Sequence, residues 1–194
     1  GLYVDQLRQL VRQVLANRVT TTEASSGASP VSRAPITVVA VHASHAMFGA
    51  PEIVPADDDT PAMPRSFYGA SKAAAETYLR IVEWETGMTV ASVRPANVYG
   101  PYQDPHGEAG VVAIFAMAML KGKTPTINGD GKYYRDYVYV EDVARANMAC
   151  IGKGSGRAFN VGTEIPTDVI EVFDALKKVT GFNKPAKFVA PRPG

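Results

Sequence analysis

Short apolar runs and longer helix-like segments alternate along the chain. Apolar runs rich in β-branched residues favour buried strands, which are predicted over 36–42, 88–94, 125–128, 135–140 and 158–161. Segments rich in helix-forming residues, or with one apolar face, favour helices, which are predicted over 2–17, 67–86, 111–121, 141–151 and 167–180. Strands that alternate with helices are typical of a parallel α/β sheet.

Segments without periodicity separate these elements. The stretch 18–35 is rich in Ser, Thr and Ala, and 50–65 is rich in Pro and Asp, so both are predicted to be loops. The acidic run 57–59 within the second loop is interpreted as a solvated turn. The stretch 95–110 is a further long loop, and loops of this length are usually functional. Gly87 is typical of the residue that ends a helix.

Composition narrows the class of protein. With 194 residues, the chain can bury about one ordinary domain core. The 20 basic and 19 acidic residues leave a net charge of +1, which indicates neither a nucleic-acid nor a membrane partner. The single cysteine, Cys150, excludes a disulfide scaffold and fits a reducing compartment, so the cytoplasm is expected. No apolar run is long enough to span a bilayer.

Tyr68 and Lys72 are the most informative pair of residues. Of the nine tyrosines, only Tyr68 has a lysine four residues later, and this spacing places both side chains on one face of a helix. A cation about 4 Å away, at an effective dielectric of about 20, favours a phenolate by about 4 kcal/mol, so Tyr68 could exchange protons near neutrality. Ser44 follows the strand 36–42, where a strand end would meet a ligand crevice. A surface tyrosine beside a surface lysine would give the same spacing by chance.

Ser44, Tyr68 and Lys72, in that order, resemble the catalytic triad of the extended short-chain dehydrogenase/reductase superfamily. Three stretches narrow the resemblance, and they read ANVYGPYQDPHGEAGVVAIF (96–115), INGDGKYYRDYVYVEDVARA (127–146) and FNVGT (159–163). They resemble the sugar-nucleotide epimerase branch of the NAD-dependent epimerase/dehydratase family, and within it the UDP-glucose 4-epimerases. The resemblance runs from about Thr37 to the last residue.

The resemblance implies a partial Rossmann-like parallel sheet with a smaller C-terminal substrate-binding lobe. Residues 1–100 are expected to belong to the NAD-binding domain, and 101–194 mainly to the sugar-nucleotide-binding lobe. Whether strands of 101–194 return to the main sheet is left open. The implied cofactor is NAD and the implied substrate a nucleotide sugar. Family members pair as homodimers through two helices, which correspond to 2–17 and 67–86.

The resemblance also assigns the residues of the site. The expected catalytic residues are Ser44, Tyr68 and Lys72. The cofactor is expected to contact Tyr68, Lys72, Pro95 and Ala96. The expected substrate-binding residues are Ser44, Asn97, Val111, Arg135, Tyr137 and Arg192. A guanidinium suits a diphosphate, although an exposed edge-strand face would explain Arg135 and Tyr137 without a ligand, and a turn would explain Asn97.

The implied reaction is epimerisation at C4 of the sugar, in which Tyr68 takes the hydroxyl proton, NAD⁺ takes a hydride from C4, and the hydride returns to the opposite face of the 4-keto intermediate. Two alternatives stay open: a keto-sugar-nucleotide reductase and a truncated, non-catalytic binding protein. His45 and Ala46 stand where dehydratases of this superfamily carry an acidic pair, so dehydration is disfavoured. His42 and His45 point to opposite faces of a strand, so no metal site is expected.

The two ends of the chain suggest a fragment. The Gly-x-x-Gly-x-x-Gly turn, which cradles the cofactor pyrophosphate in the family, is absent from the sequence, and 191–194 resembles the middle of a family motif. The chain alone is therefore expected not to hold NAD tightly and not to be active.

Overall fold

The computed structural model describes residues 37–40, 44–50, 56–106, 110–151 and 156–191. The chain divides into two units, Gly1–Pro35 and Ile36–Gly194, and every described residue belongs to the second. The helix predicted over 2–17, the loop predicted over 18–35 and Arg192 lie outside the described residues.

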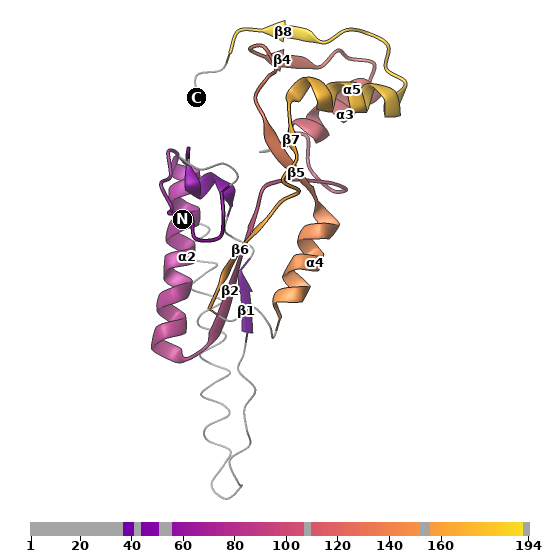
Figure 1. The fold of residues 1–194 in the computed structure, drawn as a ribbon. Coiled ribbons are helices and arrows are strands. Elements are labelled where there is room, and N and C mark those ends of the chain that lie inside the picture. The colour runs from indigo at the N-terminus through magenta and orange to yellow at the C-terminus, as the bar shows by residue number, and fades with distance from the viewer. Residues whose placement is uncertain (1–36, 41–43, 51–55, 107–109, 152–155, 192–194) are drawn as a thin grey trace, which may run out of the picture. The chain divides into compact units, whose positions relative to one another are not determined.

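The order of elements follows the predicted alternation of strands and helices (Figure 1). The strands are β1 (Thr37–Ala40), β2 (Thr89–Pro95), β3 (Asn97–Tyr99), β4 (Thr126–Asn128), β5 (Arg135–Tyr139), β6 (Ala158–Val161), β7 (Pro166–Thr167) and β8 (Lys187–Val189). The helices are the 3₁₀ helix η1 (His45–Phe48) and the α-helices α2 (Phe67–Thr86), α3 (Val111–Leu120), α4 (Val140–Cys150) and α5 (Val169–Thr180).

The main sheet is parallel and has the strand order β1-β2-β6. Helices α2 and α4 both contact β2, and Figure 1 shows them on opposite sides of the sheet. The side chains of β2 alternate accordingly, because Ala91 and Val93 pack with Cys150 of α4, while Ser92 and Arg94 bond to Glu76 of α2. The predicted parallel α/β sheet is therefore confirmed.

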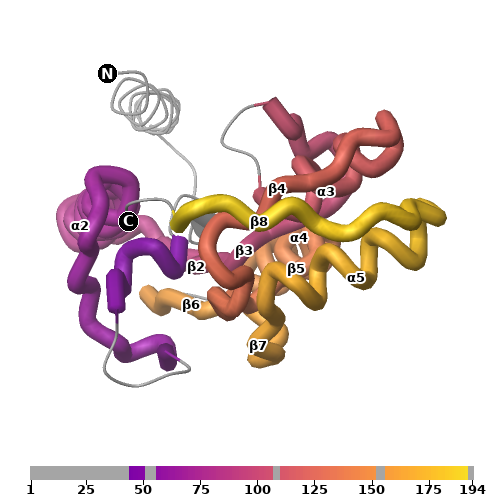
Figure 2. The backbone as a smooth tube through the Cα atoms, turned by 90° about the horizontal axis from the view of Figure 1, so that it is seen from above, coloured from indigo at the N-terminus to yellow at the C-terminus, as the bar shows by residue number. Residues whose placement is uncertain are grey.

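Two smaller sheets accompany the main one. In the first, β3 pairs with β5 in parallel and β5 pairs with β7 in antiparallel orientation. In the second, β4 and β8 run side by side in parallel (Figure 2). The domain boundary expected at residue 100 stays a prediction, but β6 lies in one sheet with β1 and β2, so residues from both sides of that boundary share the main sheet.

Three short strands were not anticipated. The predicted loop 95–110 is wrong at β3, which forms because Asn97 and Val98 pair with Tyr137 and Val138 of β5. The helix predicted over 167–180 begins two residues later, at Val169, because Thr167 belongs to β7 and Asp168 caps the helix. The third strand, β8, forms on β4. Strands of two or three residues carry no periodicity of their own, so only their partners define them.

The longest described helix, α2, has the predicted bounds because both of its ends carry local signals. The Ser66 hydroxyl accepts a hydrogen bond from the Gly69 N–H at 3.0 Å, as an N-cap serine does. Gly87 closes the helix in the left-handed region, with φ of 67°, and its N–H donates to the Glu83 carbonyl. The position of α2 along the chain is thus determined locally.

The residues after β3 build a second core between α3 and α5. Its buried members are Phe115, Met119, Ile127, Phe173 and Phe182. The Phe173 ring meets Phe115 and Phe182 edge-on, with centroids 6.2 and 6.5 Å apart, a favourable geometry for aromatic pairs. No helix in the described part of the chain is long and apolar enough to cross a membrane.

Candidate functional site

Tyr68 and Lys72 lie on one face at the start of α2. The Lys72 Nζ atom is 5.1 Å from the centroid of the Tyr68 ring. The Tyr68 side chain is 49 % exposed, so a ligand can reach its phenol. The proximity expected from their spacing in the sequence is therefore present in the folded chain.

Ser44 lies at the start of η1, in the residues that follow β1. Its backbone is extended, with φ of −158°, and its hydroxyl caps η1 by accepting a hydrogen bond from the Ala46 N–H at 3.3 Å. The cap fixes the serine side chain at the N-terminal end of η1, the 3₁₀ helix that packs against α2. Ser44 is half-buried.

Gly69 brings η1 and α2 together. A Cβ atom at this position would clash with the backbone carbonyl oxygen of Ala46, and the Cβ of Pro64 would lie 3.2 Å away. Gly69 is buried and follows Tyr68 directly. Only a residue without a side chain lets the first turn of α2 approach the helix that Ser44 caps.

Substitution of Gly69 by alanine is therefore expected to destabilise the protein by about 1–3 kcal/mol, as overpacking of a closed contact usually does. Thermal unfolding measures the loss, and Ser71→Ala is the matched control because Ser71 is exposed in the next turn of α2. An equal melting temperature for Gly69→Ala and the control would contradict the close approach of α2 to η1.

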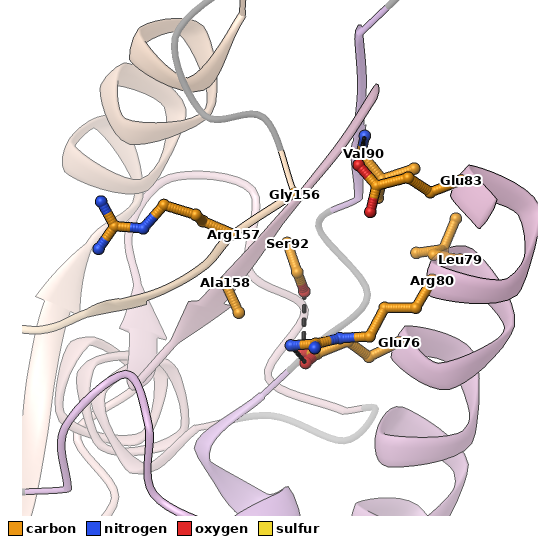
Figure 3. A pocket seen from close by; sticks show the side chains of 9 residues that line it. All are labelled: Glu76, Leu79, Arg80, Glu83, Val90, Ser92, Gly156, Arg157 and Ala158. Atoms are coloured by element: carbon orange, nitrogen blue, oxygen red, sulfur yellow. Dashed lines mark hydrogen bonds and ion pairs between the residues drawn. The ribbon is translucent and has the colours of Figure 1, made fainter. Parts of the chain in front are cut away.

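A buried ion pair holds α2 on the main sheet. The Arg94 guanidinium binds the Glu76 carboxylate through Nη2–Oε1 at 2.6 Å and Nε–Oε2 at 2.9 Å. Arg94 is 4 % exposed and Glu76 6 % exposed. The Ser92 hydroxyl also donates to Glu76, and Figure 3 shows Ser92 and Arg80 converging on this carboxylate beside a small pocket between α2 and β2. Ser44, Tyr68 and Lys72 do not line that pocket.

Arg94 also contacts the loop that holds Asp58 and the helix η1. Its Nη1 donates to the Asp58 carbonyl at 2.8 Å, and its guanidinium lies 5.3 Å from the centre of the Phe48 ring at the end of η1. The Asp58 carboxylate accepts a hydrogen bond from the Asn160 N–H of β6 at 2.6 Å. The turn predicted at 57–59 is present, and Asp57 and Asp59 are exposed, but Asp58 is half-buried and tied to β6.

Sequence reasoning missed Glu76 and Arg94, although a signal was present. Arg94 ends an apolar strand and Glu76 lies on the buried side of α2, and charged residues are almost never fully buried unless they are paired. Burial by itself raises the pKa of Glu76, but the hydrogen bonds and charge of Arg94, helped by Ser92 and Arg80, hold that pKa below its ordinary value. Glu76 is therefore an anion that balances the Arg94 cation.

The expected substrate-binding residues gather on β3 and β5. Arg135 and Tyr137 are two positions apart on β5 and so share a face, and Asn97 of β3 is in register with Tyr137. The Asn97 amide donates to the Asp136 carbonyl at 3.2 Å. Burial raises the pKa of Tyr137, the charge of Arg135 opposes this and Asp168 adds to it, so Tyr137 remains a neutral phenol.

The remaining expected contacts lie at element ends. Pro95 is the buried last residue of β2, and the Ala96 N–H donates to the carbonyl of Val161 at the end of β6. Val111 is the first residue of α3, behind Gly110 at the N-cap position. Pro95 and Ala96 therefore lie at the carboxyl end of β2, and Ser44 lies after that of β1, where ligands bind in open α/β sheets.

His45 lies next to the expected catalytic residue Ser44 and interacts electrostatically with Asp136, which lies among the expected substrate-binding residues. It follows Ser44 in η1, and its Nε2 atom is buried without a hydrogen-bond partner among the residues that the structure describes. Burial lowers the pKa of His45, Asp136 of β5 raises it and Arg94 of β2 lowers it, with a net lowering. No group of three or more His, Cys, Asp or Glu residues that could hold a metal lies in the described ranges.

The lowered pKa of His45 gives the stability of the protein a pH dependence. Below its ordinary pKa of 6.5, the unfolded chain binds a proton at His45 more readily than the folded chain does, so the free energy of unfolding falls as the pH falls. His45→Asn is expected to make this slope shallower between about pH 7.5 and about pH 5.5. Urea unfolding at several pH values measures it, and equal slopes in both proteins would exclude the burial of a neutral His45.

Comparisons with known proteins agree with this geometry. Residues 16–162 match the family described as "NAD dependent epimerase/dehydratase family". The UDP-glucose 4-epimerase of Mycolicibacterium smegmatis is 43 % identical over 158 residues, which cover 81 % of this chain and 50 % of that protein. The chain thus spans about half the length of the curated relatives it matches.

Solved structures give the same result. The UDP-glucose 4-epimerase of Thermotoga maritima, solved with UDP-glucose, matches with a TM-score of 0.78 at 43 % identity, over 81 % of this chain and 52 % of that one. The Thermus thermophilus UDP-glucose 4-epimerase, solved with NAD, matches with a TM-score of 0.70 at 42 % identity over the same shares. The resemblance to the NAD-dependent epimerase/dehydratase family inferred from the motifs is confirmed.

Proposed function

Because the chain belongs to the NAD-dependent epimerase/dehydratase family, we propose that it forms the catalytic and sugar-binding part of a nucleotide-sugar 4-epimerase of the UDP-glucose/UDP-galactose type. The observation that carries this proposal is the pair of Tyr68 and Lys72 on one face of α2, beside the 3₁₀ helix that Ser44 caps. A base, its cationic neighbour and a hydroxyl that orients the substrate are what removal of a proton from a sugar hydroxyl requires.

Each catalytic side chain has a distinct role in this proposal. Tyr68 takes the proton from the sugar 4-hydroxyl, and Ser44 orients that hydroxyl. Lys72 supplies the cation beside this base, because its ammonium lies near the ring. Tyr68 and Lys72, with Pro95 and Ala96 at the end of β2, would hold the nicotinamide half of NAD, which supplies hydride acceptance and return at C4.

The substrate contacts come from β3, β5 and α3. Arg135 is exposed, and its fork of N–H groups suits a sugar diphosphate. Tyr137 remains a phenol and can donate a hydrogen bond to the nucleotide. Asn97 donates to Asp136 but has further polar positions for a ligand, and the N–H groups at the start of α3, at Val111, favour a phosphate. Arg192 stays an expected contact outside the described residues.

Interconversion of UDP-glucose and UDP-galactose with NAD⁺ tests the proposal directly. The chain is assayed alone and as a fusion that supplies the rest of a relative's length. Net consumption of NAD(P)H with a keto-sugar nucleotide would instead support the reductase alternative. Binding of UDP-sugars without turnover in either form would support the non-catalytic alternative. His45 and Ala46, which follow Ser44, supply no carboxylate for a dehydration.

We also propose that the protein is a cytoplasmic homodimer that pairs through the helix expected over 2–17 and through α2. The exposed face of α2 carries Phe67, Tyr78 and Ile81, which are 99, 57 and 41 % exposed, with Trp84 beside them at 87 %. Helical spacing places the first three on one side, away from Glu76 and the sheet. A stripe of this kind on a long helix favours helix-to-helix pairing.

Sedimentation is expected to show a dimer at micromolar concentration, and Ile81→Glu is expected to dissociate it because a carboxylate would be buried in the pairing face. Tyr102→Ser is the matched control, since Tyr102 is fully exposed at 105 % on a loop far from α2 in the sequence. A monomer for the unchanged protein, or a dimer that survives Ile81→Glu, would count against pairing through this face.

A further inference from the structure

The carboxylate of Asp136 is held by three donors from the segment that follows β6. It accepts hydrogen bonds from the Thr163 N–H at 2.8 and 2.9 Å, the Thr163 hydroxyl at 2.7 Å and the Glu164 N–H at 2.9 Å. Hydrogen bonds to an ionised acceptor are about twice as strong as neutral ones. This carboxylate therefore links β5 to the end of β6.

The backbone of 162–164 is shaped around that carboxylate. A Cβ atom on Gly162 would clash with the Asp136 Oδ2 atom, so the close approach requires glycine. Glu164 has a φ of 61°, a left-handed conformation that residues other than glycine rarely adopt. Successive N–H groups in a turn of this kind form a small concave binding site for an anion, and here the anion is a side chain of the protein.

Asp136 lies among the expected substrate-binding residues and is linked to the end of the main sheet. It stands between Arg135 and Tyr137 on β5, its carbonyl accepts from Asn97 of β3, and it is in register with Pro166 of β7. The segment 162–164 continues from β6, which belongs to the main sheet with β1 and β2. The charge of Asp136 also acts on His45, next to Ser44.

We propose that Asp136 is a positioning residue: its carboxylate, held by Thr163 and Glu164, fixes β5 against the main sheet and thereby places Arg135 and Tyr137 relative to Ser44 and Tyr68. What Arg135 and Tyr137 bind rests on the proposed function. A carboxylate is required because all three donors need an acceptor, whereas the NH₂ group of asparagine would oppose one of them.

Hydrogen exchange followed by NMR tests the link without any ligand. In Asp136→Asn, the amides of Thr163 and Glu164 are expected to exchange at least about tenfold faster, because they lose a charged acceptor. The amides of Arg135 and Tyr137 should also exchange faster. Thr163→Val, which removes the hydroxyl bond to Asp136 and the bond that this hydroxyl accepts from the Ile165 N–H, should change the exchange of the Thr163 and Glu164 amides less. Asp174→Asn, at an exposed position of α5, is the control and should change none of these rates.

Calorimetry with UDP tests the consequence for binding. Asp136→Asn and Arg135→Ala are each expected to weaken UDP binding by about tenfold, and the double variant should be little worse than either, because Asp136 acts through Arg135. If the losses of UDP affinity multiply in the double variant, and the two single variants lower the melting temperature equally, Asp136 has only a general stabilising role. That result would overturn the proposal. Unchanged exchange rates in Asp136→Asn would overturn it as well. If the unchanged protein bound no UDP, the proposed function would fail, while the exchange rates would still decide the role of Asp136.

Discussion

Tyr68→Phe is expected to lower kcat for C4 epimerisation by about 10²–10⁴-fold, the usual contribution of a positioned acid/base. The variant loses only the phenolic oxygen that takes the proton, while the ring beside Lys72 is kept. The affinity for the nucleotide sugar should therefore change little, since the proposed diphosphate and nucleotide contacts lie on β3, β5 and α3. Steady-state kinetics, with calorimetry of UDP-glucose binding, measure both quantities.

Tyr78→Phe is the matched control for this experiment. Tyr78 is exposed on the same helix, but a valine rather than a lysine stands four residues after it. The kcat of Tyr78→Phe should equal that of the unchanged protein. Full turnover by Tyr68→Phe would remove Tyr68 as the base, and equal losses in both variants would attribute the effect to α2 as a whole.

Arg94→Met is expected to destabilise the protein by about 3–5 kcal/mol, because it leaves the Glu76 carboxylate buried without its cation. Glu76 would keep only the Ser92 hydroxyl and the exposed Arg80, whose Nη2 lies 3.5 Å from the Glu76 Oε1 atom. Since Arg94 also contacts Asp58 and Phe48, η1 and the loop that holds Asp58 should loosen as well. Urea unfolding near neutral pH measures the loss.

Two variants separate the ion pair from simple packing. Arg80→Ala should cost less than about 1 kcal/mol, because that side chain is 61 % exposed. Glu76→Leu combined with Arg94→Met should recover most of the stability, since no charge is left buried. In the unchanged protein, Glu76 contributes fully to the free energy of unfolding above its ordinary pKa of 4.5. This contribution is lost as the pH falls through the lower pKa that Glu76 has in the folded chain. A loss for Arg94→Met as small as that for Arg80→Ala would show that the pair does not hold α2.

The sequence by itself determined the elements that carry their own signals. Ser66 and Gly87 mark both ends of α2 within one turn, and β6 was predicted with its observed bounds, Ala158–Val161. The pairing of Tyr68 with Lys72 was predictable for the same reason, since four residues on a helix are one turn. Local chemistry was sufficient in these cases because the partners are near neighbours in the chain.

The tertiary structure alone decided the features whose partners are far apart in the chain. β3, β7 and β8 exist because of β5 and β4, and Gly69 meets Ala46 across two helices. Glu76 and Arg94 are 18 residues apart, and Asp136 and Thr163 are 27 apart. Side chains at such separations meet only after the chain has closed a loop and buried them, and a buried charge is stable only beside the partner that the fold brings to it.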